Sequence, residues 1–154
     1  MAIGLRYIPD RDEVRDVLQD SFVSILTSID EFDYRGEGSL KSWVSRIVTN
    51  HALDWLRDHD RMRKTDDLPD EADEEADDEQ PDVDKVPPDI LNSMIGRLPD
   101  GYRMVLNLHV FSQMPHQEIA RKLGIKEASS ASQFFHAKRL LAEMIKEYIN
   151  SQKR

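Results

Sequence analysis

Hydrophobic residues recur at steps of three and four positions along most of the chain, and this period is typical of amphipathic helices. Residues 31–38 interrupt the pattern with two glycines and are expected to form a loop. A short helix at residues 1–8 should end at Pro9. The pattern as a whole predicts an all-α protein. We expect the remaining helices at residues 10–29, 39–61, 89–97, 102–112, 115–123 and 128–148.

The two long helices of the first half should each pack through one apolar face. The inward positions expected for the first are Val14, Val17, Leu18, Phe22, Ile25, Leu26 and Ile29. Those expected for the second are Leu40, Trp43, Val44, Ile47, Val48, His51 and Trp55. Residues 10–13, Ser39 and Asp89 carry the side chains expected to cap the N-termini of three helices.

Residues 115–141 predict two short helices joined by a turn. Ile119 and Ala120 share one apolar face, and Gly124 then supplies the backbone freedom of a tight turn. A small residue such as Ala120 lets two helices cross closely, as in a helix-turn-helix. The second helix opens on small polar residues and continues with cations, so an exposed face of this kind suits a major-groove reader. On spacing alone, a surface helical hairpin explains the pattern equally well.

Charge is distributed unevenly along the chain, whose formal net charge is −9. Residues 65–84 contain 12 Asp and Glu and no Lys or Arg, whereas residues 90–154 contain 10 basic and 5 acidic residues, a net charge of +5. The average therefore conceals a basic C-terminal part that is compatible with nucleic acid. We expect two small helical domains, residues 1–64 and 89–154, joined by a flexible acidic linker at residues 65–88. The C-terminal domain contains the helix-turn-helix.

Composition also excludes several kinds of site. The chain has no cysteine, which rules out disulfides, thiolate metal sites and cysteine nucleophiles. No apolar run approaches the roughly 20 residues that span a bilayer, so we expect no membrane insertion. The N-terminus lacks the basic and apolar regions of a signal peptide, and we expect a cytoplasmic protein. The five histidines have no metal-binding spacing, so we expect no metal and no cofactor.

One pair of carboxylates could in principle support catalysis. Asp16 and Asp20 lie one helical turn apart, with Gln19 on the same face and Phe22 beside them. Such a pair can act as general acid and base or as metal ligands. Because no third ligand or histidine lies near them in the sequence, and no phosphate-binding loop accompanies them, a solvated face is the better interpretation. We expect no catalytic residue and no enzyme activity.

Several longer segments carry a more specific signal. DVLQDSFVSIL at residues 16–26 has the pattern D-x-x-Q-[DE]-x-F, and FDYRGEGSLKSWVSRIVTNHALDWLR follows it at residues 32–57. In the second half, LPDGYRMVLNLHVF (98–111), QEIARKLGI (117–125) and SQFFHAKRLL (132–141) follow one another. In this order, with a linker between the two sets, they resemble regions two and four of the extracytoplasmic-function (ECF) family of bacterial RNA polymerase sigma factors. The resemblance covers nearly the whole chain.

The resemblance implies a sigma factor that directs RNA polymerase core to specific promoters and initiates transcription. It implies contacts with the β′ clamp helices and the β flap of the core enzyme and with promoter DNA, and an anti-sigma factor is a further candidate partner. Clamp docking is then expected at Asp16, Gln19, Asp20 and Phe22. The unpaired strand of the downstream element is expected at Glu37, Gly38, Ser39, Lys41, Trp43, Arg46, Ile47, Asn50, Arg57 and Arg61. Duplex DNA is expected at Gln117, Arg121, Ser129, Ser130, Ser132, Gln133, His136, Lys138 and Arg139.

The sequence departs from the family at several positions, and other functions stay open. The family usually begins well upstream of Leu5, so most of the first helix of region two should be absent. Ser130 stands where many relatives carry Val, and Ala131 stands where relatives often carry Lys or Arg, which removes one phosphate contact. One alternative is a helix-turn-helix regulator that binds duplex DNA without polymerase. Another is an adaptor whose acidic segment binds a basic partner protein. In a sigma factor, the same segment would be a simple tether or a mimic of nucleic acid that competes for the basic second domain.

Overall fold

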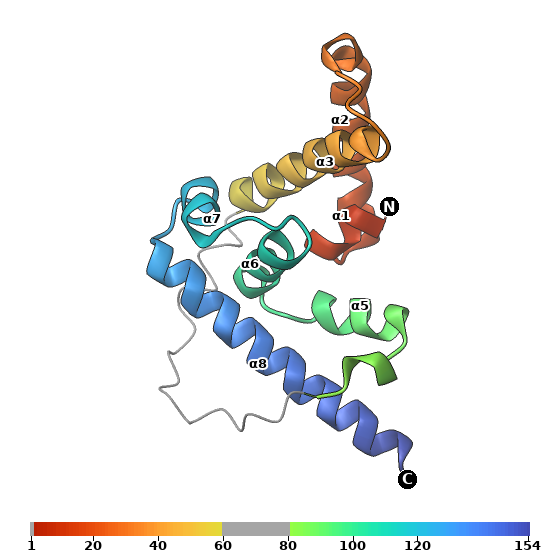
Figure 1. Cartoon of the computed structure of the whole chain (residues 1–154), viewed down its shortest axis with the longest axis vertical. Helices are drawn as coiled ribbons and strands as arrows, with labels where there is room; N and C mark the ends of the chain where they lie inside the picture. Colours follow the sequence, from red (N-terminus) through yellow and green to blue (C-terminus); the bar gives the residue numbers. More distant parts are fainter. Residues whose placement is uncertain (1, 60–80) are drawn as a thin grey trace. The chain divides into compact units, whose positions relative to one another are not determined.

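The computed structural model describes residues 2–59 and 81–154, and the chain divides into two compact units, residues 1–61 and 62–154 (Figure 1). Every regular element within the described residues is a helix, which confirms the all-α prediction. None of the described helices is long and apolar enough to cross a membrane. Each unit is described by itself.

Within its described residues the first unit has three α-helices that pack against one another: α1 (Ala2–Tyr7), α2 (Arg11–Thr27) and α3 (Ser39–Asp58). α2 begins as predicted, because Oδ1 of Asp10 accepts hydrogen bonds from the backbone N–H groups of Asp12 and Glu13, at 2.9 and 3.0 Å. Burial of α2 and α3 is concentrated at Val14, Val17, Val48, Ala52, Leu53 and Leu56.

A glycine sets how closely α1 approaches α2. Gly4 is buried, and a Cβ atom placed on it would collide with Cγ2 of Val14, a fully buried side chain. The absence of a side chain at this position therefore permits the packing of the short first helix. Protein interiors are close-packed, so an extra methyl group at this position would displace the neighbouring side chains.

The connection between α2 and α3 consists of a short 3₁₀ helix, Ile29–Glu31, and the irregular residues 32–38. The expectation that Ser39 caps α3 is wrong. Gly38 occupies the cap position with a left-handed backbone (φ 84°), and Ser39 is the first helical residue. The Ser39 hydroxyl instead closes the loop, because it donates to the carbonyl oxygen of Gly36 at 2.8 Å and accepts from the N–H of Arg35 at 3.3 Å.

Among its described residues, 81–154, the second unit has the 3₁₀ helix Val83–Lys85 and four α-helices: α5 (Pro88–Gly96), α6 (Asp100–Val110), α7 (His116–Leu123) and α8 (Glu127–Gln152). The long helix α8 contacts each of the other three (Figure 1). One apolar cluster joins Ile95, Leu98, Tyr102, Leu106 and Ala137. A second cluster is formed by Val86, Met94 and Ile145, and Val86 lies within the predicted linker.

Three predicted boundaries in this unit are wrong. Residues 65–80 of the expected linker lie outside the described residues, but its end is folded, since Val86 is buried in the second cluster. α5 begins at Pro88 with Pro87 at its cap position, so Asp89 lies within the first turn and is not the cap. α6 begins at Asp100 and not at Tyr102, because the expected turn of Leu98–Gly101 is shorter than its composition suggested.

Candidate nucleic-acid and partner interfaces

Several large apolar side chains of the first unit are exposed on α2. Phe22 is 61% exposed, and Val23 and Leu26 are exposed to nearly the same degree, although Phe22 and Leu26 were expected to point inward. Ile29, just after the helix, is also exposed, so three of the seven predicted core positions of this helix are wrong. We call Phe22, Val23, Leu26 and Ile29 the α2 apolar face.

The acidic positions continue this face toward the start of the helix. Asp16, Gln19 and Asp20 are all exposed. Positions 16, 19/20, 23 and 26 are separated by three or four residues and therefore share one side of α2. The three predicted polar docking residues thus lie on the same side of α2 as Val23 and Leu26 of the α2 apolar face, and Phe22 lies one turn from Gln19 and Leu26. The combined surface is acidic at one end and apolar at the other.

α2 and α3 are also joined by a polar contact on their packed sides. The Oγ atom of Ser24 lies 2.7 Å from Nε2 of His51, and both residues are half-buried. A serine and a histidine at this distance resemble part of a hydrolytic triad. The contact is better explained as a link between two helices, since no carboxylate of the described residues forms a hydrogen bond with the other ring nitrogen. His51 therefore takes a structural role.

The predicted single-strand site lies on the loop before α3 and on one side of that helix. Glu37, Gly38 and Lys41 are exposed, while Trp43 is half-buried with its ring centroid 5.3 Å from that of Phe32. The positions of Trp43, Arg46/Ile47 and Asn50 recur at three or four residues, which places them on one side of α3. Among them Arg46 and Asn50 are exposed and Ile47 is half-buried.

Two arginines complete the predicted single-strand site, and Arg57 lies two turns after Asn50 on the same side of α3. Arg57 is exposed near the end of α3, where its Nη1 lies 3.8 Å from Oδ1 of Asp54, an exposed ion pair that contributes little to stability. Trp55 stacks on His59 with centroids 3.9 Å apart. Arg61 lies outside the described residues.

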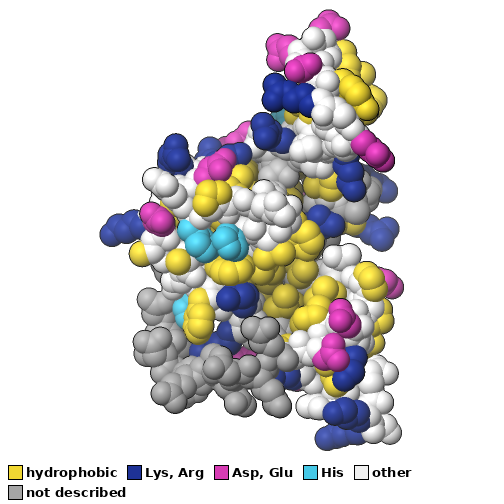
Figure 2. All heavy atoms as spheres, viewed as in Figure 1, with side chains coloured by type: hydrophobic (Ala, Val, Ile, Leu, Met, Phe, Trp, Pro, Cys, Tyr) yellow, Lys and Arg dark blue, Asp and Glu magenta, His cyan; other side chains and the backbone are white. Residues whose placement is uncertain are grey.

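The second unit contains the predicted helix-turn-helix. Gly124 has the left-handed backbone (φ 68°) that was expected between α7 and α8, and the N–H of Ile125 donates to the carbonyl oxygen of Ala120 at 3.1 Å. Ile119 and Ala120 are buried, which permits the close crossing of the two helices. Figure 2 shows Lys and Arg side chains around α7 on the viewed face. Gln117 and Arg121 of α7 are exposed.

The exposed side of α8 differs from the predicted one. Ser130 is 0% exposed and Gln133 is also buried, so the expectation that these two side chains lie on an exposed DNA-facing surface is wrong. Ser129, Ser132, His136 and Arg139 are half-buried, and Lys138 is exposed. Two of these side chains are engaged within the unit: the His136 ring stacks on Tyr102 at 5.7 Å, and Nε of Arg139 lies 3.6 Å from Oε1 of Glu143.

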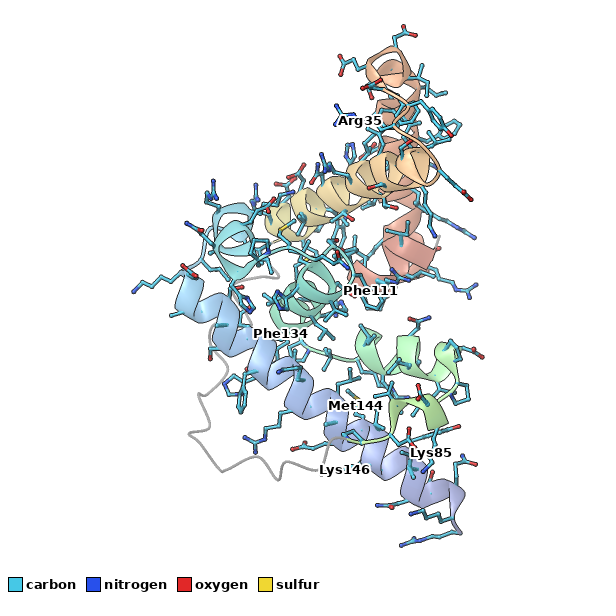
Figure 3. The ribbon with its side chains drawn as sticks, in the orientation of Figure 1. Arg35, Lys85, Phe111, Phe134, Met144 and Lys146 are labelled. Carbon is cyan, nitrogen blue, oxygen red and sulfur yellow. The ribbon has the colours of Figure 1, made fainter. Side chains whose placement is uncertain are left out.

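Ser130 is buried because it belongs to a joint between three helices. Nδ1 of His116, the first residue of α7, lies 2.9 Å from the Ser130 hydroxyl in the first turns of α8. The His116 ring stacks on the ring of His109 from α6, and Figure 2 shows two adjacent histidines between α6 and α7. Phe134, labelled in Figure 3, packs its edge against His109.

Burial lowers the pKa of His116 below its ordinary value of 6.5, and the nearby His109 lowers it further. Lys138 acts in the same direction, whereas the carboxylate of Glu127 opposes the shift. The neutral imidazole is therefore the form that fits this joint. His109 Nδ1 lies 2.9 Å from the carbonyl oxygen of Met114, so that nitrogen carries a proton and donates.

Sequence reasoning missed two sets of exposed residues. Phe135, which is 41% exposed on α8, was not among the predicted DNA contacts, although it lies one turn after Ala131 and shares its face. Val23 and Leu26 of α2 were not among the predicted docking residues. Leu26 was predicted to be core because the apolar stripe of α2 is wider than the surface that the helix buries, whereas Val23 and Phe135 were assigned no role.

Comparisons with known proteins match both units. The family described as Sigma-70 region 2 matches residues 1–62, and the family described as Sigma-70, region 4 matches residues 89–141. The chain is 25% identical over 140 residues to RNA polymerase sigma factor SigV of Bacillus subtilis, across 90% of this chain and 80% of the relative. It is 27% identical over 150 residues to the ECF RNA polymerase sigma-E factor of Haemophilus influenzae, across 91% and 78%.

The chain belongs to the ECF family of sigma factors. SigM of Bacillus subtilis, an ECF RNA polymerase sigma factor, is 24% identical to it over 144 residues, across 93% of this chain and 86% of the relative. In this sigma factor the region 2 match covers the described helices of the first unit. The region 4 match covers most of α5, all of α6 and α7, and α8 as far as residue 141. The chain therefore directs RNA polymerase to promoters.

Proposed function

We propose that the first unit of this sigma factor binds core polymerase and single-stranded promoter DNA, and that the second unit binds duplex DNA. The α2 apolar face and the acidic residues Asp16 and Asp20 dock on the β′ clamp helices of core polymerase. The loop before α3 and the side of α3 that carries Asn50 hold the unpaired strand of the downstream element. α7 and α8 hold the upstream element as a duplex. A contact with the β flap and competition from an anti-sigma factor belong to the same proposal.

The observation that carries the proposal is the exposure of the α2 apolar face. Four large side chains, Phe22, Val23, Leu26 and Ile29, are each at least 46% exposed on adjacent positions. Contiguous exposed apolar surface of this kind indicates a protein partner, since in water it has no compensating interaction. A regulator that binds duplex DNA alone has no need for it. The polymerase-dependent function is therefore favoured over the duplex-binding alternative.

The composition of this surface also fits a docking site. Interface hot spots form around a buried aromatic or aliphatic anchor, and charged residues at the rim set orientation and association rate. Phe22 provides the anchor, and Asp16 and Asp20 provide a negative rim that complements a basic surface on the partner. Neither carboxylate has an ion-pair partner recorded within the described residues.

The experiment that tests the proposal is transcription by purified bacterial core polymerase with this full chain on a template library. The expected result is promoter-dependent transcripts from the wild-type chain and a loss of core binding by Asp20→Lys. Isolated duplex binding by the Asp20→Lys variant should remain, since α7 and α8 are unchanged. Duplex binding without any effect on core polymerase would favour the alternative, a regulator that acts without polymerase.

A further inference from the structure

The part of α8 that would enter a DNA groove presents an apolar surface. Ala128, Ala131 and Phe135 are exposed and recur at steps of three and four, so they lie on one side of the helix. Ser132 flanks them and is half-buried. We call Ala128, Ala131, Ser132 and Phe135 the α8 reading face.

The chemistry of this face excludes the commonest base contacts. Guanine is usually read by a bidentate Arg or Lys, and adenine by a bidentate Asn or Gln. Residues 127–137 contain no Arg, Lys or Asn, and the amide side chain of Gln133 is buried. Apolar side chains such as Ala and Phe match a different feature of the major groove, the C5 methyl group of thymine.

We infer that α8 selects its upstream element through thymine methyl groups, with Ala131 and Phe135 as the residues that determine specificity. This inference rests on the proposed duplex-reading role of α8 and deepens it. The span from Ala128 to Phe135 is about 10 Å along the helix axis. At about 3.4 Å per base pair, the reading face covers about three consecutive base pairs. Two or more of these pairs should therefore present a thymine to the helix.

Duplex DNA is the occupant that the surroundings of this face favour. Arg121 of α7, Lys126 at the cap position of α8 and Lys138 after the reading face are all exposed, so cations stand at both ends of the apolar surface. Cations placed in this way meet the phosphates on either side of a groove. The exposed Glu127 disfavours phosphate at the tip of α8 and can accept a hydrogen bond from the amino group of a cytosine. The N-terminus of α8 therefore faces the bases of the duplex and not its phosphates.

The test uses the full chain bound to bacterial core polymerase and a library of duplexes with a random upstream segment. The library is amplified once with thymidine triphosphate and once with deoxyuridine triphosphate, so that the two pools differ only in the C5 methyl groups. Bound duplexes are sequenced, and the affinity of the enriched element is then measured with single uracil substitutions. A C·G pair and a 5-methylcytosine·G pair also replace each critical T·A pair.

The expected result is an element with adjacent thymines, each of which weakens binding about fourfold when replaced by uracil, the factor that corresponds to the burial of one methyl group. The 5-methylcytosine pair should bind better than the C·G pair at the same position. Phe135→Ala should abolish the thymine preference at one position and keep it at its neighbour. The control Lys138→Ala should weaken the thymine and uracil elements by the same factor, because it loses a phosphate contact.

Two outcomes would overturn the inference, and they separate it from the proposed function. Enrichment of the same element from both pools, with uracil tolerated at every position, would show that α8 reads duplex DNA by other groups and would leave the proposed function intact. Failure to enrich any upstream element from either pool would overturn the duplex-reading role of α8 and the inference with it.

Discussion

The imidazole rings of His109 and His116 stack almost in parallel, with their centroids 4.3 Å apart and their planes inclined by 10°. This stack joins α6 to α7, and the contact of His116 with Ser130 extends the joint to α8. Two neutral rings pack well at this distance, but two imidazolium rings repel each other. The first turn of α8 also disfavours a protonated His116, since the N-terminus of a helix destabilises a nearby cation.

The stability of the helix-turn-helix should therefore fall in acid. The pKa of His116 is lowered in the folded chain, so the unfolded chain binds more protons as the pH falls below the ordinary histidine value of 6.5. The contribution of His116 is fully present above that pH and is lost as the pH falls to its lowered pKa. Thermal unfolding of the full chain between pH 8 and pH 5, monitored by circular dichroism, measures the effect.

His116→Phe provides the control, because it keeps a ring on His109 and removes the titrating group. The acid-induced decrease in the midpoint of unfolding should be smaller in this variant than in the wild type. An equal decrease in both chains would assign the acid sensitivity to other groups. Lys138 and Glu127 also face His116, and both are unchanged in the variant, so the comparison isolates position 116.

Burial separates the roles of two serines on α8 that lie two residues apart. Ser132→Ala should change the preference for one base pair, with a loss of about 1–3 kcal/mol at that position, if its half-buried hydroxyl reaches a base. Ser130→Ala should leave sequence preference unchanged and lower stability by about 1 kcal/mol, because it removes the hydrogen-bonding partner of His116. The comparison is made by binding selection on a random duplex library and by chemical denaturation. Identical selected elements from both variants would refute the role given to Ser132.

Two leucines of the first unit should separate partner binding from stability. Leu26→Ala should weaken binding to core polymerase about tenfold while the chain remains as stable as wild type, since this side chain is 59% exposed. Leu56→Ala should lower stability by about 2–5 kcal/mol, because Leu56 is fully buried. Calorimetry with core polymerase and urea denaturation measure the two quantities. Unchanged affinity of the Leu26 variant would remove the α2 apolar face from the proposed interface.

Gly4→Ala should destabilise the first unit by about 1–3 kcal/mol, because the added methyl group would collide with Cγ2 of Val14. The double variant Gly4→Ala, Val14→Ala should recover part of this loss, since it removes the atom that blocks the methyl group. A double-mutant cycle of unfolding free energies isolates the interaction between the two positions. Additive losses in the double variant would mean that the two side chains do not compete for the same space.

The elements and the turn of the helix-turn-helix were predictable because local chemistry determines them. The Asp10 cap, the end of α1 before Pro9 and the left-handed Gly124 each follow from a property of one residue or its neighbours. The exposed faces were not predictable in the same way. Periodicity placed Phe22 and Leu26 inward, because a hydrophobic stripe has the same spacing whether it faces a core or a partner.

The predicted exposure of two polar residues of α8 was wrong for the complementary reason. Ser130 and Gln133 were read as exposed because they are polar, yet Ser130 is buried against a histidine that is 14 residues away in the sequence. Such a pairing depends on how α7 and α8 cross, which no local pattern specifies. Asn50 and Arg46 are exposed on α3, as a contact with DNA requires, but their role stays a prediction.

The role of Asn50 can be tested through strand opening. The proposed single-strand site on α3 must offset a few kcal/mol of lost stacking and pairing when a base is flipped from the duplex. Stacking on an aromatic ring recovers about 1–3 kcal/mol, and Trp43, which is half-buried beside Phe32, is the ring on the same side of α3. An amide both donates and accepts, so Asn50 can read the edge of the flipped base. Asn50→Ala should therefore leave closed-complex formation nearly unchanged and reduce open complexes on a duplex promoter.

Two controls distinguish this role from a packing role. A template with a premelted downstream bubble should rescue the Asn50→Ala variant only in part, because the contact with the base is still lost. Arg57→Ala, which alters an exposed cation near the other end of α3, should weaken binding to all sequences about equally. Permanganate reactivity of unpaired thymines reports the fraction of opened promoter. Wild-type reactivity of the Asn50→Ala complex on duplex DNA would exclude Asn50 from the capture of the flipped base, since opening must be driven by contacts of this kind.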